Sequence, residues 1–273
     1  ESEISAYTGS IEAVEIFYKT GADWINQEMT NTFGNTYQSI ITGLYDGMLI
    51  QYYIQAINSE GIVESFPILA PEQNIMFTIG ELPAIYFSDF EGNSNSWIIG
   101  DESDNATAGL WELADPIATY NDEGFQIQPD NDYSQPGSYC FITGNGYEQG
   151  NGGYDDVDNG KTTLYSPVFD LGSYESILLS YWYWYTNNIG DNGGNDIWKV
   201  SVSNNGGVSW DDIQNTTSSN TEWRNFQLIL DDLIDLTENV QFRFIAEDIL
   251  YENDNGSGGS LVEAALDNFL LSN

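Results

Sequence analysis

Four acidic and amide-rich runs offer the oxygen atoms that a calcium ion binds. They are DFEG at 89–92, YDDVDNG at 154–160, NNIGDNGGND at 187–196 and VEAALDN at 262–268. Calcium takes about six to eight oxygens from carboxylates, amide side chains and backbone carbonyls. None of the runs has the spacing of an EF-hand loop. Acids in hydrated loops and at strand ends favour calcium over a buried proton donor, and the alternative is that they are solvated turn residues.

Several kinds of catalysis and metal binding are excluded by missing residue types. The chain has no histidine and a single cysteine, Cys140, so it has no Ser-His-Asp or Cys-His triad, no histidine zinc site and no internal disulfide. The run NGKTT at 159–163 resembles the end of a phosphate loop, but Asp155 stands where that loop needs glycine. Paired carboxylates stay open among 43 acids. The sequence as a whole predicts a protein that is not an enzyme.

The charge balance restricts the partners. Five Lys and Arg against 43 Asp and Glu give a formal net charge of −38, which repels nucleic acid and anionic membranes. Three interpretations of the charge remain open. It keeps the protein soluble in a salty or cold environment, it binds cations at a few sites, or it forms a lattice or matrix held together by divalent ions.

The composition indicates that strands position these acids. The chain has 18 Tyr, 13 Phe and 8 Trp, which suit pleated surfaces, and 27 Gly, which suit turns. Alternating segments at 14–20, 48–58 and 74–80 predict a small sandwich over residues 1–82. After a linker at 80–84, residues 83–273 show no long helical period. We therefore expect an all-β protein in which a small immunoglobulin-like sandwich precedes a larger jelly-roll sandwich.

The larger unit should contain eight or more strands. The expected strand segments are 84–91, 138–144, 162–171, 177–187, 196–206, 223–233, 240–248 and 263–273. We read 232–240 as a loop. Long connections at 92–135 and 144–160 separate the first strands, and connections of this length are more often functional or ordered by ions than idle.

Two stretches resemble known families. The segments at 14–30 and 50–67 resemble the fibronectin-III or immunoglobulin-like modules of secreted bacterial proteins. The pieces SPVFDL at 166–171, SNNGGVSW at 203–210 and VEAALDNFLL at 262–271 resemble the MAM-like, carbohydrate-module-like jelly rolls appended to secreted peptidases of marine bacteria, notably those of zinc carboxypeptidase type.

The resemblance also implies where calcium is bound. In jelly rolls of this kind an acid after the first strand meets an aspartate of the last strand at one ion, which implies Glu91 and Asp267 here. A second cluster would use Asp156, Asp158, Asp196 and Glu263.

An aromatic row supplies a candidate ligand surface. In the segment 181–185, tyrosines alternate with Trp182 and Trp184, so one set faces the core and the other faces outward. Outward tryptophans would stack on sugar rings, and the alternative is that acidic loops cover them. Arg243, in mid-strand, needs a carboxylate partner, for which we expect Glu263 or Asp196.

These features predict a non-catalytic, calcium-stabilised accessory region of a larger secreted protein, such as a peptidase or another hydrolase. It would serve as a spacer or bind substrate, carbohydrate or a surface. The expected partners are a neutral polysaccharide, a protein substrate, a cell-surface component or copies of itself, outside the cell. The alternative is a structural subunit of an acidic surface layer, filament or extracellular matrix.

Overall fold

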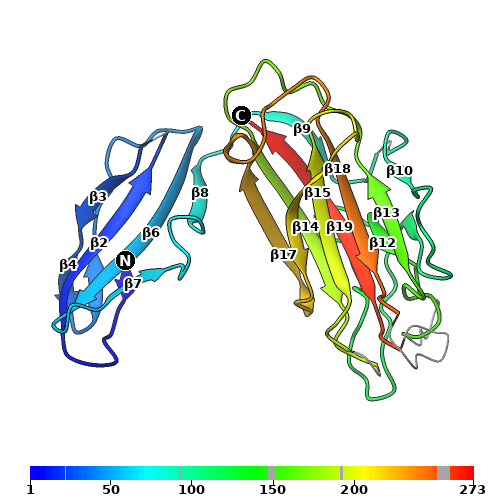
Figure 1. The fold of residues 1–273 in the computed structure, drawn as a ribbon, viewed down its shortest axis with the longest axis horizontal. Helices are drawn as coiled ribbons and strands as arrows, with labels where there is room; N and C mark the ends of the chain where they lie inside the picture. Colours follow the sequence, from blue (N-terminus) through cyan, green and yellow to red (C-terminus); the bar gives the residue numbers. More distant parts are fainter. Residues whose placement is uncertain (22, 93, 147–151, 191–192, 251–258) are drawn as a thin grey trace. The chain divides into compact units, whose positions relative to one another are not determined.

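A computed structural model describes residues 1–21, 23–92, 94–146, 152–190, 193–250 and 259–273 (Figure 1). Apart from one 3₁₀ turn at Leu230–Asp232, the regular elements in these ranges are strands, which confirms the all-β prediction. No helix long and apolar enough to cross a membrane occurs in the described residues. The chain divides into two compact units, Glu1–Pro83 and Ala84–Asn273.

Unit 1 contains two antiparallel sheets. One sheet has the order β1-β5-β4, and the other has the order β3-β2-β6-β7 with β8 also pairing with β6. The strands are β1 (Ser2–Glu3), β2 (Ile11–Lys19), β3 (Ile25–Glu28), β4 (Thr30–Phe33), β5 (Thr36–Gln38), β6 (Met48–Asn58), β7 (Val63–Phe66) and β8 (Ile75–Ile79). The fully buried part of its main core cluster is small, with Val14, Ile16 and Met29 at its centre.

Unit 2 is a sandwich of a six-stranded and a five-stranded sheet. The β19 sheet has the order β11-β12-β19-β14-β17, with β9 also pairing with β19, and the β18 sheet has the order β10-β13-β18-β15-β16. The strands are β9 (Ala84–Ser88), β10 (Ile98–Ile99), β11 (Trp111–Ala114), β12 (Cys140–Thr143), β13 (Lys161–Tyr165), β14 (Leu178–Thr186), β15 (Ile197–Ser203), β16 (Asp211–Thr216), β17 (Asn220–Ile229), β18 (Gln241–Glu247) and β19 (Glu263–Ser272).

Aromatic rings fill the space between these two sheets. Trp198 of β15 is fully buried and stacks on Tyr183 of β14 with ring centroids 5.5 Å apart. Phe244 of β18 and Phe269 of β19 join the same core cluster. Because the tyrosines of β14 face this core, the tryptophans of that strand lie on the opposite face of the β19 sheet.

Some expectations from sequence need correction. Arg243 does not pair with Glu263 or Asp196, because its strand turns it to the outer side of the β18 sheet, where its guanidinium lies 4.5 Å from the centre of the Trp210 ring. Strands β10, β11 and β16 lie in segments where no strand was expected. Each is short or polar, so the hydrophobic pattern of its residues gives little signal.

Two glycines pack tightly against the acidic loop that carries Asp156 and Asp158, two of the candidate metal ligands. Gly109, at φ +65°, lies so near residues 156–157 that an added Cβ would come within 2.3 Å of the Val157 nitrogen. Gly144 packs equally tightly, since its added Cβ would meet the Asp155 carbonyl oxygen at 1.8 Å. The acidic loop is therefore clamped against the strand ends beneath it.

We expect Gly109→Ala to destabilise the protein by about 3–5 kcal/mol, because left-handed strain and overpacking add. Gly124→Ala is the matched control, since Gly124 also has a positive φ of 84° but has open space around it. That control should lose only about 1–2 kcal/mol. Urea unfolding measures both, and equal losses would contradict the clamp.

Candidate functional site

Strand topology gathers five acids at one end of unit 2. Strand β18 runs antiparallel to both of its neighbours, so its C-terminal end meets the N-terminal ends of β13 and β15. Asp248 follows β18 and Asp196 precedes β15. Asp156 and Asp158 precede β13, and Glu263 opens β19 in the other sheet. We call Asp156, Asp158, Asp196, Asp248 and Glu263 the acid cluster.

Backbone contacts hold the acid cluster together. The Asp248 N–H donates to the Gly160 carbonyl at 2.9 Å, and the Asp248 carboxylate accepts the Asn159 N–H at 2.7 Å. The Ile249 N–H donates to Asp196 Oδ1 at 2.9 Å. Between the sheets, the Val157 N–H donates to the Val262 carbonyl at 2.9 Å. The cluster is thus built from strand ends of both sheets.

Burial makes negative charge unfavourable for four members of the acid cluster, Asp156, Asp158, Asp196 and Glu263. Desolvation raises the pKa of Asp156 to about 8, with Asp158 and Asp248 adding repulsion. Desolvation also raises the pKa of Asp158 and that of Asp196. The pKa of Glu263 is raised well above its usual range by burial and then by Asp156. At neutral pH these groups need protons or cations to remain buried.

Several buried oxygens in this region lack a hydrogen-bond partner among the described residues. They are Asp156 Oδ2, Asp158 Oδ1, Asp196 Oδ2 and, nearby, Asn187 Oδ1. Asp156 and Asp196 are 2% and 0% exposed. Among the described residues, Lys199 forms an ion pair with Asp212, outside the acid cluster. No lysine or arginine in the described ranges compensates the acid cluster.

These residues offer a divalent cation oxygens but no complete cage of carboxylates. No group of three or more acidic or cysteine side chains in the described ranges is arranged to hold a metal ion alone. Calcium also accepts amide and backbone oxygens, and the orphaned oxygen of Asn187 is of that kind. The donor set therefore fits calcium only if neutral oxygens complete it.

Sequence reasoning named four members of the acid cluster and missed Asp248. Its signal was its place as the last residue of the expected strand segment 240–248, which pairs with the strand that Asp196 precedes. The calcium role of all these residues stays a prediction.

The other predicted pair, Glu91 and Asp267, accepts hydrogen bonds from backbone N–H groups of one loop, residues 133–139. Asp267 Oδ2 accepts the Tyr133 and Ser134 N–H groups at 2.8 and 2.9 Å. Glu91 Oε1 accepts the Ser138 N–H at 2.7 Å. Desolvation still raises the pKa of Asp267 to about 6, although these N–H donors oppose it. Backbone donors thus occupy these two carboxylates, and their calcium role also stays a prediction.

Residues 117–134, which we call the cover segment, cross the outer face of the β19 sheet. The indole N–H of Trp184 and the hydroxyl of Thr186 donate to the Ile127 carbonyl at 2.7 and 3.0 Å. The indole N–H of Trp223 donates to the Asn131 carbonyl at 3.1 Å. Together with Asp267, these groups fasten the cover segment along the length of the sheet face.

The two tryptophans proposed for ligand stacking lie in different environments. Trp184 is 4% exposed and packs with Cys140, Ile142 and Ala265, so its ring is not available to a ligand. The cover segment is the reason, as in the alternative in which acidic loops hide the row. Trp182 is half-buried and stacks on Tyr133 with centroids 3.7 Å apart, which occupies one face of its ring.

This difference predicts that Trp184→Ala destabilises unit 2 by about 3–5 kcal/mol, because a large buried ring and its hydrogen bond are lost. Trp182→Ala, on the same strand face, should lose about half as much, because part of that ring is already in water. Urea unfolding followed by circular dichroism measures both values. A larger loss for Trp182→Ala would contradict the assignment.

A groove of about 570 Å³ opens beside the cover segment. It is lined by Asn121, Glu123, Phe125, Gln126, Asn188, Ile189, Gly190 and Thr221. Asn121 caps the tight turn, since its side-chain oxygen accepts the Glu123 and Phe125 N–H groups at 3.1 and 2.8 Å. The turn leaves the Phe125 ring 59% exposed. No sequence motif marked this groove, because it forms where two distant loops meet.

Comparison with known proteins gives fold-level likenesses only. No family model and no curated protein sequence matches the chain. Among solved structures, it is similar to the C-terminal family 22 carbohydrate-binding module of Clostridium thermocellum Xyn10B, at 10% identity over 69% of this chain and 93% of that one (TM-score 0.38).

Two further likenesses are of the same strength. A cleaved adhesin domain of Lys-gingipain from Porphyromonas gingivalis W83 is similar at 13% identity over 68% of this chain and 96% of that one (TM-score 0.39). TmCBM61, solved in complex with β-1,4-galactotriose, is similar at 15% identity over 67% and 92% (TM-score 0.38). Likeness at this level carries no functional assignment.

Proposed function

We propose that this chain is a non-catalytic, calcium-stabilised accessory region that binds a neutral polysaccharide through unit 2, as part of a larger secreted hydrolase. The observation that carries the proposal is the groove beside the cover segment, where amide side chains surround an exposed aromatic ring.

The groove has the chemistry that a sugar requires. Sugar rings present C–H faces that stack on aromatic rings, and hydroxyls that bond to amides. Phe125 offers the ring, and Asn121, Gln126 and Asn188 carry amides on the same walls. One atom of each amide is already bonded within the protein, namely Asn121 Oδ1, Gln126 Nε2 and Asn188 Oδ1. A concave surface with a few polar groups is the usual form of a ligand site.

The aromatic surface continues from the groove along β17. Thr221 lines the groove, and Trp223 lies two residues further on the same face of the strand. Trp223 is half-buried and lies with its ring centroid 6.3 Å from that of Tyr133. A chain of sugars can therefore extend beyond one residue.

Charge selects the kind of polysaccharide. The charged residue lining the groove is Glu123, and the whole chain carries −38. Sulfated or uronic polymers are repelled at short range, whereas neutral polymers are not. The ligand class that this groove favours is a neutral glycan.

Phe125→Ala should weaken binding to a neutral polysaccharide about threefold to tenfold, the effect of losing one aromatic contact. Xylan, β-1,4-galactan and β-glucan are suitable probes in affinity electrophoresis, with heparin as the anionic comparison. Phe87→Ala is the matched control, because Phe87 is similarly exposed at 51% but lies on β9 outside the groove.

Equal binding by the Phe125 variant and the wild type would reject this groove as the glycan site. If no neutral polysaccharide binds and calcium instead drives self-association in light scattering, the structural-subunit function replaces the proposed one.

Calcium would stabilise unit 2 through the acid cluster. Asp156, Asp158 and Asp196 supply buried carboxylate oxygens without partners among the described residues, and Asn187 supplies an amide oxygen. A bound divalent cation would compensate for the desolvation that raises the pKa of Asp156, and for the added repulsion from Asp158 and Asp248. Its free energy of binding would add to the stability of the folded state.

Compared with the wild type, the variant Asp156→Asn should have an equal or higher melting temperature in chelator and a lower one in calcium. At pH 8.5 in chelator it should melt at or above the wild type, because a buried uncompensated charge is removed. Calcium at about 100 times its Kd should raise the wild-type Tm by roughly 5–10 °C and the variant much less. Differential scanning calorimetry measures both conditions.

The control is Asp211→Asn, which removes the same charge from an exposed position on β16. It should respond to calcium as the wild type does. A wild-type melt that is unchanged by calcium, with no calcium found by elemental analysis, would reject the calcium part of the proposal and leave the glycan part intact.

A further inference from the structure

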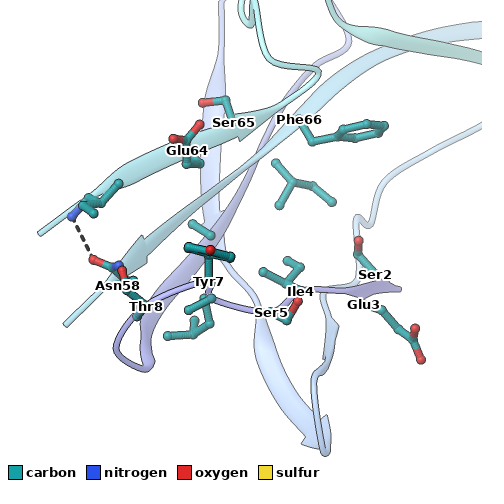
Figure 2. Close-up of a pocket in the computed structure, with 15 residues that line it drawn as sticks. Ser2, Glu3, Ile4, Ser5, Tyr7, Thr8, Asn58, Glu64, Ser65 and Phe66 are labelled. Atoms are coloured by element: carbon teal, nitrogen blue, oxygen red, sulfur yellow. Dashed lines mark hydrogen bonds between the residues drawn. The ribbon is translucent and has the colours of Figure 1, made fainter. Parts of the chain in front are cut away.

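Unit 1 contains an open groove that the proposed function does not use. It encloses about 730 Å³ between the N-terminal segment 2–8 and the strands β6 and β7. Figure 2 shows Glu64, Ser65 and Phe66 on one wall, with Ile4 and Tyr7 on the segment across from them. The groove is thus bounded by chain from both sheets of this unit.

The floor of the groove is the apolar interior of the small sandwich. Ile4, Ile11, Ile54 and Ala56 line it, and all four are only partly buried where they pack against the core cluster of Val14. The sheet on this side has three short strands, against five in the opposite sheet. The core is therefore left unsealed along one side, at the edge of a sheet.

The rim of the groove exposes more apolar surface. Tyr7 is fully exposed, Phe66 is 67% exposed and Ile62 is 47% exposed. Apolar side chains that gather around a concave surface mark interaction sites more often than chance exposure does.

Strand β7 supplies free backbone groups beside the groove. In the described residues it pairs with β6 alone, with Ile54 opposite Phe66 and Ala56 opposite Glu64. The Asn58 N–H donates to the Ile62 carbonyl, so alternation along the pair directs the backbone groups of Glu64 and Phe66 toward β6. The backbone groups of Val63 and Ser65 then point away from the sheet and can receive another strand.

The charge around the groove determines which strand fits. The charged residues that line it are Glu3 and Glu64. Unit 1 as a whole has eleven Asp and Glu but one Lys, and that Lys19 lies over the ring of Trp24 on another part of the unit. An incoming strand with Lys or Arg beside its apolar residues is attracted, whereas a second copy of this acidic chain is repelled.

We propose that this groove binds an extended peptide segment of a partner protein, in which apolar residues alternate with Lys or Arg, by adding it as a strand to β7. Main-chain hydrogen bonds to Val63 and Ser65 align the segment, its apolar side chains cover Ile4, Ile54 and Ala56, and its cations lie near Glu3 and Glu64. This site is independent of the glycan groove of unit 2.

Fluorescence anisotropy with the full 273-residue chain tests the proposal. The probe is a labelled eight-residue peptide of alternating Val and Lys, measured in about 0.15 M salt to screen long-range attraction. Two comparison peptides are the same sequence with alternate backbone amides N-methylated, and a Val-Glu version. The proposal requires that only the unmodified Val-Lys peptide binds.

Three variants locate the binding. Glu64→Lys should weaken the peptide at least tenfold, while Glu28→Lys, the same change on β3 at the opposite edge of the sheet, should leave it unchanged. Ser65→Pro should abolish binding, because the Ser65 N–H points away from β6 and proline there blocks the free edge without breaking the existing pair. Circular dichroism melts establish that each variant is folded.

Several results would overturn the proposal. Equal binding of the N-methylated peptide, or equal loss in the Glu64 and Glu28 variants, would mean general attraction to an acidic protein. Failure of the Val-Lys peptide to bind the folded chain at millimolar concentration would reject the site. A dimer in sedimentation that Ser65→Pro dissociates would make a second copy the occupant.

Discussion

Burial of carboxylates on β19 is the constraint around which unit 2 is organised. This strand lies in the middle of its sheet, so Glu263 and Asp267 are removed from water as soon as the cover segment lies over them. A buried carboxylate requires hydrogen-bond donors, a proton or a cation. Asp267 receives backbone N–H groups, and this fixes the path of the cover segment at Tyr133 and Ser134.

Glu263 is satisfied in part, and its remaining charge affects its surroundings. Its carboxylate accepts the Gln128 amide at 3.2 Å and the Thr143 hydroxyl at 3.1 Å, both neutral donors. Asp156 repels it from the adjacent loop and receives no compensating donor on its own Oδ2. The same strand therefore carries one carboxylate that organises the backbone and another that belongs to an uncompensated cluster. The cover segment also links Asp267 to the groove of unit 2, because it carries both the N–H groups that bind Asp267 and the turn of Phe125.

Much of the fold was predictable, because strands with strong alternation identify themselves. The segment 177–187 alternates tyrosine and tryptophan, and β14 occupies 178–186 of it. Strand β16 was missed because its residues Asp211–Thr216 are polar and it pairs at a sheet edge. For the site, local sequence pointed to Asp156 and Asp158 as oxygen-rich turns. It could not reveal that the cover segment buries Trp184, because this depends on a contact between residues 57 positions apart.

The position of β19 also bears on how unit 2 forms. The first strand of unit 2, β9, pairs with β19, so Phe87 must meet Leu270, which lies near the opposite end of the unit's sequence. The β19 sheet lacks its middle until residues 263–272 are available, because β12 and β14 pair on opposite sides of that strand. Pairing between such distant segments requires a large loss of chain entropy before contacts compensate for it, which slows folding. A nascent chain therefore cannot complete this sandwich progressively from β9 onward, and its aromatic segments stay without their partner strand until β19 is available.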